Sequence, residues 1–394
     1  MKESHAPILL ILEGTYPWYR GGVSEWIHQY LKYNPRQLFH IIQIATDEYR
    51  YAPIDEALYE LPDHVQKFER VSPPELSAEW ENELRRWIKN VEKQVSLFVE
   101  ESSFIHIVNT GFAGWLGKEL AIHFKKPLVL TEHALYWKEI MMGAVALECG
   151  YKVPEEKREK EAFGKMFRLM AAEIYSISDV IVSVSKSNIP EQQKLGARDV
   201  HYIPNGIPAS RLKQFIPQQS STLTIGWIGR CAEMKNPMKF FDVVSTFGEY
   251  EAENVEFIMV TCNAGEPELE QRVRTREREF NHLEVIWNRS SEDFIDQMDA
   301  LCITSHNESQ PLVLFEALGR KILPVGWRTG DVTAEYGFIL DPEATTGELV
   351  QSVLELWKKP QEWLRIVENR FMNVQAHHTW EKIFDHYRSL LLQL

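Results

Sequence analysis

Short apolar, β-rich runs alternate with helical patterns along this chain, and the alternation occurs twice. Such an order is typical of parallel sheets covered by helices, because consecutive parallel strands need a crossover connection. The predicted strands of the first series are residues 7–12, 39–45, 104–109, 127–131, 179–185 and 200–203, with helices at 24–32 and 78–99. The second series has strands at 223–228, 255–261, 283–287, 300–304, 322–325 and 338–341. We therefore predict an α/β protein with two doubly wound, Rossmann-like domains.

The length of the chain agrees with two domains. It has 394 residues, of which 44% are hydrophobic, enough to fill two cores. The polar, poorly patterned segment 208–221 separates the two series and is the predicted linker. Two doubly wound sheets joined in this way are expected to face a cleft, where the carboxyl ends of the strands bind ligands.

Charge and cysteine usage exclude several classes of protein. There are 43 Lys and Arg against 57 Asp and Glu, and the net charge of −14 opposes nonspecific binding to nucleic acid or anionic lipid. The cysteines have neither metal-site nor disulfide spacing: Cys149, Cys231, Cys262 and Cys302. The chain opens with a charged segment, and no apolar run approaches the ~20 residues of a transmembrane helix. We expect a cytoplasmic protein without a nucleic-acid partner.

The strongest chemical motif consists of two glutamates, Glu308 and Glu316, eight positions apart after the predicted strand 300–304. Pro311 suits the first position of a helix, because its missing N–H needs no partner there. Glu308 is then expected in the strand-to-helix loop and Glu316 in the helix. Free N–H groups at a helix start favour an anion, so these residues fit a phosphate flanked by two hydroxyl-bearing groups. A sugar nucleotide has that arrangement.

A second motif follows the first predicted strand of the second series. Arg230 and Lys235 lie in its loop, and Asn236 can cap a helix that begins at Pro237. Two fixed cations at a strand end can neutralise a diphosphate, with Arg as a rigid fork of donors and Lys as a point charge. Solvated surface charges are the default interpretation, but the position between a strand and a capped helix favours a binding role.

Two motifs of the first series are less specific. Gly21 and Gly22, at a helix start, let backbone amides approach a phosphate or sugar, although an ordinary flexible loop explains them equally well. His133 follows a buried strand, where an imidazole can contact a substrate hydroxyl or move protons, but a lone histidine is more often structural.

Other patterns have structural interpretations. Asn205 and Gly206 form a turn that closes the first domain. A helical stripe in the mixed-charge segment 155–168 and just beyond it is assigned to core packing, with contact to a lipid-linked acceptor as the lesser alternative; it comprises Phe163, Met166, Phe167 and Met170.

Taken in chain order, these motifs resemble family 4 of the retaining glycosyltransferases, which have the GT-B fold. The segments EGTYPWYRGGVSEWIH (13–28), TEH (131–133), IPNGI (203–207) and QPLV (310–313) are similar to the Pel exopolysaccharide glycosyltransferases. The resemblance covers most of the chain. It implies that the segment from His377 to Tyr387 is a last helix that crosses back to the first domain. The implied domains are residues 1–207 plus 375–394 on the acceptor side and 208–374 on the donor side.

The resemblance also implies roles for individual residues. Arg230 and Lys235 would bind the donor diphosphate, Glu316 the ribose hydroxyls and Glu308 the donor sugar. Backbone amides around Gln310, Leu312 and Val313 would hold the phosphate or sugar, and His133 and Gly22 would complete the site from the first domain. The implied catalytic residues are therefore Glu308, His133, Arg230 and Lys235. The donor-binding residues would be Gly22, Arg230, Lys235, Glu308, Gln310, Leu312, Val313 and Glu316.

The chain departs from the family pattern at two loops. The family commonly has Gly-Pro soon after the second glutamate and then Gly-Gly, whereas this chain has Arg320-Lys321-Ile322-Leu323-Pro324 and Thr329-Gly330-Asp331. Ala134 also stands where relatives usually have Gly. No implied phosphate or ribose ligand is lost, but these loops shape the sugar pocket.

We expect transfer of a hexosyl unit, with retention, from a nucleoside diphosphate sugar to a glycan or other hydroxyl acceptor. UDP-glucose or UDP-N-acetylhexosamine is the expected donor, and bacterial polysaccharide or glycoconjugate synthesis the expected setting, with peripheral contact to a membrane synthase complex. The absence of an Asp-x-Asp triplet favours a reaction without metal or other cofactor. A sugar-nucleotide epimerase of the same fold and a noncatalytic sugar-nucleotide-binding subunit are the alternatives. A dehydrogenase is disfavoured because the glycine fingerprint is missing.

Overall fold

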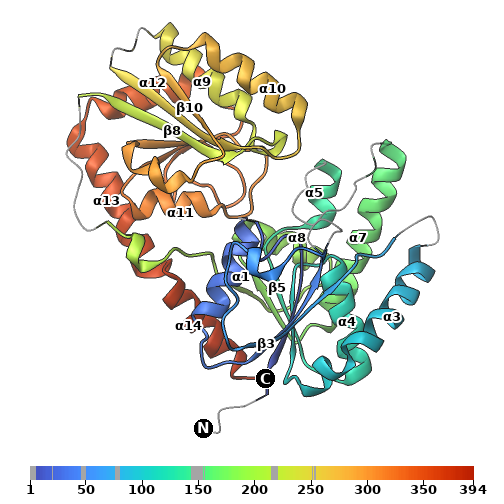
Figure 1. Ribbon diagram of the computed structural model, residues 1–394. Helices are drawn as coiled ribbons and strands as arrows, with labels where there is room; N and C mark the ends of the chain where they lie inside the picture. The colour runs from blue at the N-terminus through green and yellow to red at the C-terminus, as the bar shows by residue number, and fades with distance from the viewer. Residues whose placement is uncertain are drawn as a thin grey trace. The chain divides into compact units, whose positions relative to one another are not determined.

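The computed structural model describes residues 6–19, 21–45, 50–75, 80–142, 154, 156–213, 221–250, 252 and 254–394. The chain forms two compact units (Figure 1). The first unit comprises Met1–Pro204 and Phe384–Leu394, and the second comprises Asn205–Ile383. Cys149 and residues 214–220 of the predicted linker lie outside the described residues.

The first unit is built on a seven-stranded sheet with the order β3-β2-β1-β4-β5-β6-β7. All its neighbouring strands are parallel. The strands are β1 (Ile8–Glu13), β2 (Phe39–Ile44), β3 (Val65–Val71), β4 (Ile105–Val108), β5 (Leu128–Glu132), β6 (Val180–Ser183) and β7 (Val200–Tyr202). The chain order reverses between β1 and β4, so the topological switch point lies at the carboxyl ends of these two strands.

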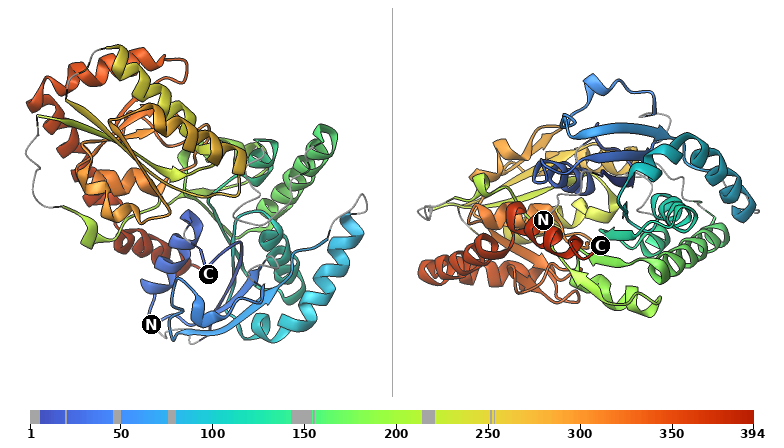
Figure 2. Two further views of the ribbon diagram at one scale, coloured as in Figure 1. Left: turned by 45° about the horizontal axis from the view of Figure 1, so that its top comes forward. Right: turned by 90° about the horizontal axis from the view of Figure 1, so that it is seen from below.

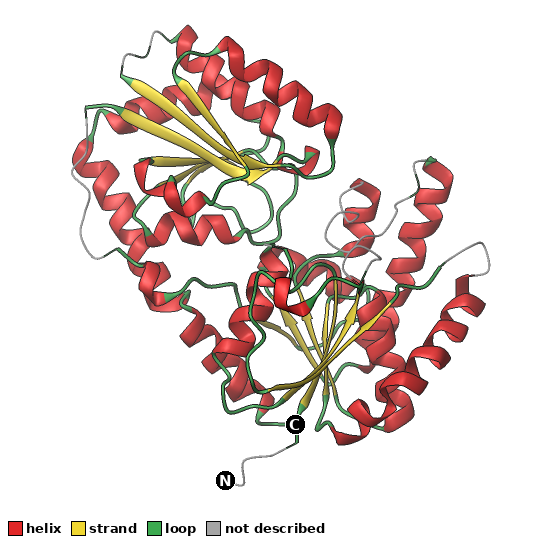
Figure 3. Cartoon of the chain, viewed as in Figure 1, coloured by secondary structure: helices red, strands yellow, loops and turns green. Residues whose placement is uncertain are grey.

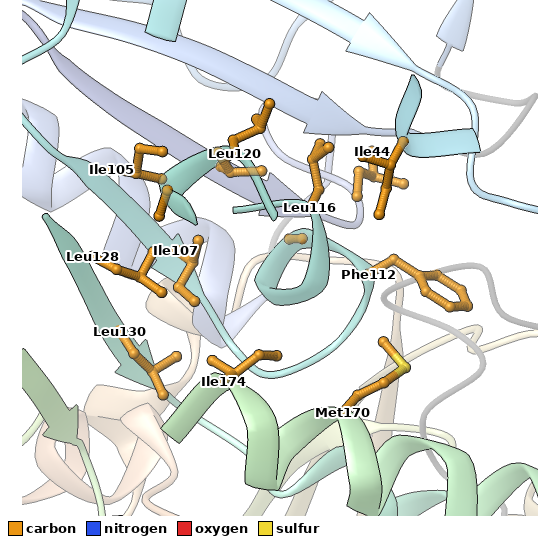
Figure 4. Close-up of a cluster of buried hydrophobic side chains, with 14 of the residues drawn as sticks. Ile44, Ile105, Ile107, Phe112, Leu116, Leu120, Leu128, Leu130, Met170 and Ile174 are labelled. Atoms are coloured by element: carbon orange, nitrogen blue, oxygen red, sulfur yellow. The ribbon is translucent and has the colours of Figure 1, made fainter. Parts of the chain in front are cut away.

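Helices cover both faces of this sheet, as Figures 2 and 3 show. One layer contains α3 (Trp80–Glu101), α4 (Phe112–Phe124) and α7 (Lys157–Ile177), with α5 (Tyr136–Met142) beside α7. Its core holds the apolar stripe of α7, where Met166, Phe167 and Met170 are buried and Phe163 packs at the edge, which confirms core packing for that stripe. Figure 4 shows side chains of α4 and α7 packed on β4 and β5.

The opposite face of the first sheet is covered by α1 (Gly22–Lys32) and the last helix, α14 (Trp380–Leu391). A buried aromatic group joins these helices to the sheet. Trp26 lies with its ring centroid 5.6 Å from that of Tyr387 and 6.0 Å from that of Phe384. The Thr131 hydroxyl donates a hydrogen bond to the Tyr387 hydroxyl at 3.2 Å. The last helix therefore contributes to the core of the first unit.

The second unit contains a six-stranded parallel sheet with the order β10-β9-β8-β11-β12-β13. Its strands are β8 (Leu223–Arg230), β9 (Val255–Cys262), β10 (Leu283–Trp287), β11 (Ala300–Ile303), β12 (Leu323–Trp327) and β13 (Phe338–Leu340). Its helices are α9 (Pro237–Glu249), α10 (Pro267–Arg276), α11 (Leu312–Gly319), α12 (Thr346–Trp357) and α13 (Pro360–His377). The short helix α8 (Ile189–Lys194) precedes them in the chain and belongs to the first unit. Separate apolar clusters pack α9 and α12 on one face and α11 on the other.

The two doubly wound sheets and the returning last helix confirm the predicted fold class. Each predicted strand matches an observed one with ends that differ by at most two residues. Sequence analysis does not predict β3, because Gln66, Lys67 and Glu69 interrupt its apolar pattern. This strand lies at the edge of the sheet and is only half-buried, so its sequence retains polar residues.

We predict that Leu116→Ala destabilises the first unit strongly. Leu116 is fully buried between α4 and the sheet, so truncation leaves a cavity that costs about 2–5 kcal/mol of the free energy of unfolding. Thermal unfolding should show a lower midpoint. The control is Leu97→Ala on α3, whose side chain is 62% exposed and whose truncation should cost less than about 0.5 kcal/mol. Equal midpoints for the two variants would contradict this account of the core.

Candidate active site

The glutamate motif of the second unit lies where β11 leads into α11. β8 and β11 are neighbours at the centre of the sheet, and the chain order reverses between them. Glu308 lies in the loop and Glu316 in the helix, as predicted. Pro311 occupies the N-cap position, so α11 begins one residue later than predicted, at Leu312. Leu312 and Val313 therefore present the first backbone N–H groups of the helix, which have no partner within a helix.

Glu308 and Lys235 form an ion pair. The Lys235 Nζ lies 2.6 Å from Glu308 Oε1, and the same oxygen accepts a hydrogen bond from the Ser305 hydroxyl at 2.8 Å. Side-chain exposure is 26% for Lys235 and 11% for Glu308, so the contact is largely shielded from water. The two residues are far apart in sequence, and the adjacency of β8 and β11 brings them together.

Backbone contacts hold the two loops of this ion pair in register. The hydroxyl of Thr304 accepts a hydrogen bond from the Trp227 indole N–H at 2.9 Å. The same hydroxyl donates to the carbonyls of Lys235 and Asn236, at 3.0 and 2.9 Å. The His306 N–H donates to the Met234 carbonyl at 2.9 Å. The position of the Lys235 ammonium is thus set by the backbone around it.

The loop after β8 has the predicted local structure. Asn236 adopts the left-handed conformation (φ 49°), caps α9 by accepting a hydrogen bond from the Lys239 N–H, and precedes Pro237 at the first helical position. Arg230 is the last residue of β8 and is half-buried. Arg230 and Lys235 thus leave the same central strand at the switch point of the sheet, where ligands of such folds bind.

The loop after β12 contacts the loop that carries Glu308. Gly330 has φ +52°, and a Cβ atom there would lie 1.6 Å from the Glu308 carbonyl oxygen, so only glycine fits. The Asp331 N–H donates to the Ser309 carbonyl at 2.9 Å. Gly330 and the backbone N–H of Asp331 therefore hold the loop that carries Glu308.

The side chain of Gln310 is buried and bonded within the protein. Its Oε1 accepts the Asn205 N–H at 2.5 Å, and its Nε2 donates to Asp331 at 3.3 Å. Asn205 Nδ2 also donates to the Gln310 carbonyl at 3.1 Å. The side chain and carbonyl of Gln310 therefore fix the loop to Asn205 and Asp331. Asn205 was predicted as a simple turn residue, and its pairing with Gln310 could not be predicted.

Glu316 occupies the second turn of α11 and pairs with a residue that sequence analysis did not select. Arg211 Nη1 lies 2.9 Å from Glu316 Oε1, with side-chain exposures of 27% and 22%. Arg211 also pairs with Glu292. No sequence signal marks Arg211, because it lies in the polar segment that was predicted as linker.

In the first unit, His133 is buried against Trp26, with ring centroids 5.0 Å apart. The backbone N–H of His133 donates a hydrogen bond to Asn109 Oδ1 at 2.7 Å. Burial lowers the pKa of the imidazole to about 3, so His133 is neutral at physiological pH. Its Nε2 atom has no hydrogen-bond partner among the described residues. A neutral ring nitrogen of this kind suits a hydrogen bond to a hydroxyl better than proton transfer at pH 7.

Gly22 begins α1, after Gly21 in an extended N-cap conformation. An added Cβ at Gly22 would meet no atom within 4 Å, so the backbone there is open to an approaching group. The preceding loop is fixed by Gln43, whose Nε2 donates to the Gly14 carbonyl at 2.9 Å and also bonds the Tyr16 carbonyl.

Two buried carboxyl groups of the first unit were not predicted as functional. Glu13 ends β1, and its Oε2 accepts the Ala113 N–H at 3.2 Å, at the start of α4. Burial raises the pKa of Glu13 to about 8, against the opposing effect of the helix amides. Glu132 ends β5 and accepts hydrogen bonds from Thr110, Tyr175 and Gln192 at 2.5–2.6 Å, and burial raises its pKa as well.

The carboxyl group of Glu13 therefore occupies the start of α4 at the switch point of the first sheet. The start of α4 approaches so closely that a Cβ at Gly111 would lie 2.0 Å from Glu13 Oε1. A helix start is a common seat for a phosphate, and here the protein's own carboxyl fills it. Only the position of Glu13 at a strand end could have indicated this in the sequence.

Comparison with known proteins identifies the fold. Solved structures align over nearly the full length of both chains. HepE of Anabaena in complex with UDP-glucose has 16% identity and a TM-score of 0.72 and covers 98% of this chain and 100% of its own. Sucrose-phosphate synthase of Thermosynechococcus elongatus has 14% identity and a TM-score of 0.75, with coverages of 99% and 100%. A trehalose-6-phosphate protein of E. coli bound with UDP-2-fluoro glucose has 10% identity and a TM-score of 0.71, with coverages of 98% and 99%. The fold is GT-B, as the resemblance implies.

Sequence comparisons are less informative. A family described as a domain of unknown function (DUF3492) matches residues 6–99 and 83–199. No curated protein matches the chain. Within the described ranges, no helix combines the length and apolar character needed to cross a membrane. The same ranges contain no group of three or more His, Cys, Asp or Glu arranged to hold a metal ion.

We predict that Glu13→Gln changes how stability depends on pH. With a pKa of about 8 instead of 4.5, folded Glu13 keeps a proton that the unfolded chain has lost. Its contribution to stability is full below pH 4.5 and is lost as the pH rises to about 8, by at most ~1.4 kcal/mol per pH unit. The amide of the variant cannot ionise, so thermal unfolding should show Glu13→Gln gaining on the wild type between pH 5 and 8.

Glu100→Gln removes an exposed carboxylate from the same unit and is the matched control. Parallel profiles for Glu13→Gln and the wild type would show that Glu13 is ionised in the folded protein and that its burial does not control its titration.

Proposed function

We propose that this chain is a glycosyltransferase that moves a hexosyl unit from a nucleoside diphosphate sugar to a hydroxyl group of an acceptor. The observation that carries the proposal is the Lys235–Glu308 contact of 2.6 Å at the switch point of the second sheet. Arg230 leaves the same strand, and the α11 start follows the same loop. Solved GT-B structures that contain UDP-glucose or UDP-2-fluoro glucose support the donor class.

The chemical problem in such a transfer is the charge of the departing nucleoside diphosphate. Arg230 and Lys235 supply two cations, and the first amides of α11 supply further donors. Fixed donors of this kind stabilise developing charge because they need no reorganisation, and one can contribute ~3 kcal/mol. The ion pair with Glu308 offsets the cost of placing the Lys235 ammonium in a partly buried position.

The reaction that we propose proceeds with retention and without a metal ion. The bond between the anomeric carbon and the leaving phosphate oxygen breaks, and a bond to the acceptor oxygen forms on the same face of the sugar. The acceptor proton passes to the leaving phosphate, so no side chain is required as a general base. Glu308 contacts the sugar hydroxyls, and Glu316 accepts hydrogen bonds from the ribose.

For the first unit, the proposal assigns an acceptor-side role. The proposal assigns contacts with hydroxyl groups or a sugar to the open backbone of Gly22 and to the neutral imidazole of His133, whose Nε2 is buried in this structure. The filled helix start at Glu13 leaves less room for an anion there. We extend the proposal to a UDP-glucose or UDP-N-acetylhexosamine donor and to bacterial polysaccharide or glycoconjugate synthesis in the cytoplasm, with peripheral contact to a membrane synthase complex.

Two alternatives can be distinguished by experiment. An epimerase of the same fold would convert the donor without an acceptor, which NMR of a UDP-sugar incubated with the protein alone would show. A noncatalytic subunit would bind the donor and never turn it over. The Lys235–Glu308 pair favours the enzyme over a noncatalytic subunit. A protein that only binds the nucleotide does not need Glu308 at the sugar in addition to Glu316 at the ribose.

We predict that UDP, or UDP-sugars, raise the midpoint of thermal unfolding in a panel that also contains GDP and ADP and their sugars, because a ligand that binds only the folded state stabilises it.

Arg230→Ala and Lys235→Ala should each weaken diphosphate binding by ~1.5–3 kcal/mol, about tenfold to a hundredfold in calorimetric affinity. Lys359→Ala, which removes an exposed cation of the same unit, is the control and should bind like the wild type. Unchanged affinity in both site variants would defeat the assignment.

We predict that Glu308→Gln lowers turnover more than nucleotide affinity. The amide keeps the size of the side chain but loses the charge that pairs with Lys235 and replaces one of the two acceptor oxygens with an NH2 group. The comparison is turnover with the donor that the panel identifies against calorimetric affinity for its free nucleotide. Glu355→Gln on α12 is the surface control. Wild-type turnover in Glu308→Gln would remove Glu308 from the reacting centre.

A further inference from the structure

The segment 205–213, which opens the second unit, is bonded along the side of α11. At one end the Asn205 N–H donates to Gln310 Oε1 at 2.5 Å, just before the helix. At the other end the Lys213 N–H donates to the Gly319 carbonyl at 2.9 Å, in the last helical residue. Between them Ile207 packs so closely that a Cβ at Gly319 would lie 2.3 Å from its Cδ1. This segment and the helix that carries Glu316 are therefore one structural piece.

Arg211 is the cation of this segment that reaches Glu316. It ends a short 3-10 helix, η3 (Ala209–Arg211), and its N–H donates to the Pro208 carbonyl at 2.9 Å. Its Nη1 lies 2.9 Å from Glu316 Oε1, while its Nη2 bonds Glu292 Oε1 in η6 (Ser291–Asp293). One planar guanidinium thus holds two carboxylates from separate elements, and its own position is fixed by both.

The contact with Arg211 lies on one oxygen of the Glu316 carboxylate. A carboxylate has about four acceptor positions on its two oxygens, and the Nη1 of Arg211 takes one of them, on Oε1. The guanidinium reaches Glu316 through Nη1, and its bond from Nη2 to Glu292 fixes the point from which it contacts Oε1. Partly exposed ion pairs contribute little to stability, so the main effect of the contact is on the orientation and charge of Glu316.

We infer that Arg211 is a positioning residue for the nucleotide ribose: it orients Glu316 so that the carboxylate accepts hydrogen bonds from the two vicinal hydroxyls. The inference rests on the proposed function and deepens it, because it makes a residue of the segment 205–213 a support of the donor site. Arg211 itself does not touch the nucleotide.

Discrimination between ribose and deoxyribose tests this role. Calorimetry is performed with UDP, GDP and ADP and with their 2′-deoxy counterparts. In the wild type the ribonucleotide that binds should bind more tightly than its deoxy form. Arg211→Ala should lose roughly tenfold in affinity for the ribonucleotide and less for the deoxynucleotide, which keeps only its 3′-hydroxyl for Glu316, so that the discrimination becomes smaller. A general loss of packing would weaken both ligands equally.

Two variants calibrate the result. Glu316→Gln replaces one acceptor oxygen of the proposed ribose ligand with an NH2 group and removes its charge, and it sets the reference value for reduced discrimination. Lys213→Ala removes the other cation of the same segment, whose Nζ lies 2.8 Å from Asp296, and should keep the discrimination of the wild type. Arg211→Gln carries a neutral polar side chain and provides the same test if Arg211→Ala does not fold.

The outcomes separate this inference from the proposed function. Wild-type discrimination in both Arg211 variants, together with its loss in Glu316→Gln, would overturn the inference and leave the proposed function intact. If none of the three diphosphates binds the wild type, the proposed function fails and the role of Arg211 fails with it.

Discussion

The contact between the Lys235 ammonium and the Glu308 carboxylate is the interaction on which the rest of the second unit's chemistry depends. Each charge alone would be costly in a place this shielded, and each removes that cost for the other. The pair exists only because β8 and β11 are neighbours and because Thr304 ties the two loops together. Gly330 then supports the glutamate loop from the adjacent strand end. The order of the strands and these loop contacts therefore fix the positions of Lys235 and Glu308.

The first unit treats its own switch point in the opposite way. Its central helix start receives the carboxyl of Glu13, and nearby Glu132 is enclosed by three hydrogen-bond donors. Burial raises the pKa of both carboxyl groups and lowers the pKa of His133, so the imidazole is neutral. One unit thus has partly buried cations and helix amides at its switch point, while the other has buried polar groups there. This difference suits a division between a charged donor and an uncharged hydroxyl acceptor.

Sequence patterns predicted the elements of this structure better than its pairings. Apolar runs located the strands, and Asn236 with Pro237 located a helix start, because these signals are local. The edge strand β3 was missed because its exposure removes the apolar signal. The partner of Glu308 depends on which strands are neighbours, and the pKa of Glu13 depends on the approach of Gly111 from a distant helix. Arg211 lies in a segment with no pattern at all. Tertiary proximity is what a single sequence does not contain.

The last helix has a consequence for biosynthesis. Phe384 and Tyr387 complete the aromatic core between α1 and the first sheet, yet the whole second unit is encoded between them and the rest of that core. A ribosome makes the chain from its N-terminus, so the first unit emerges with part of its interior uncovered. It can close that interior only when the final residues have been synthesised. The second unit, which is continuous from Asn205 to Ile383, carries no such delay.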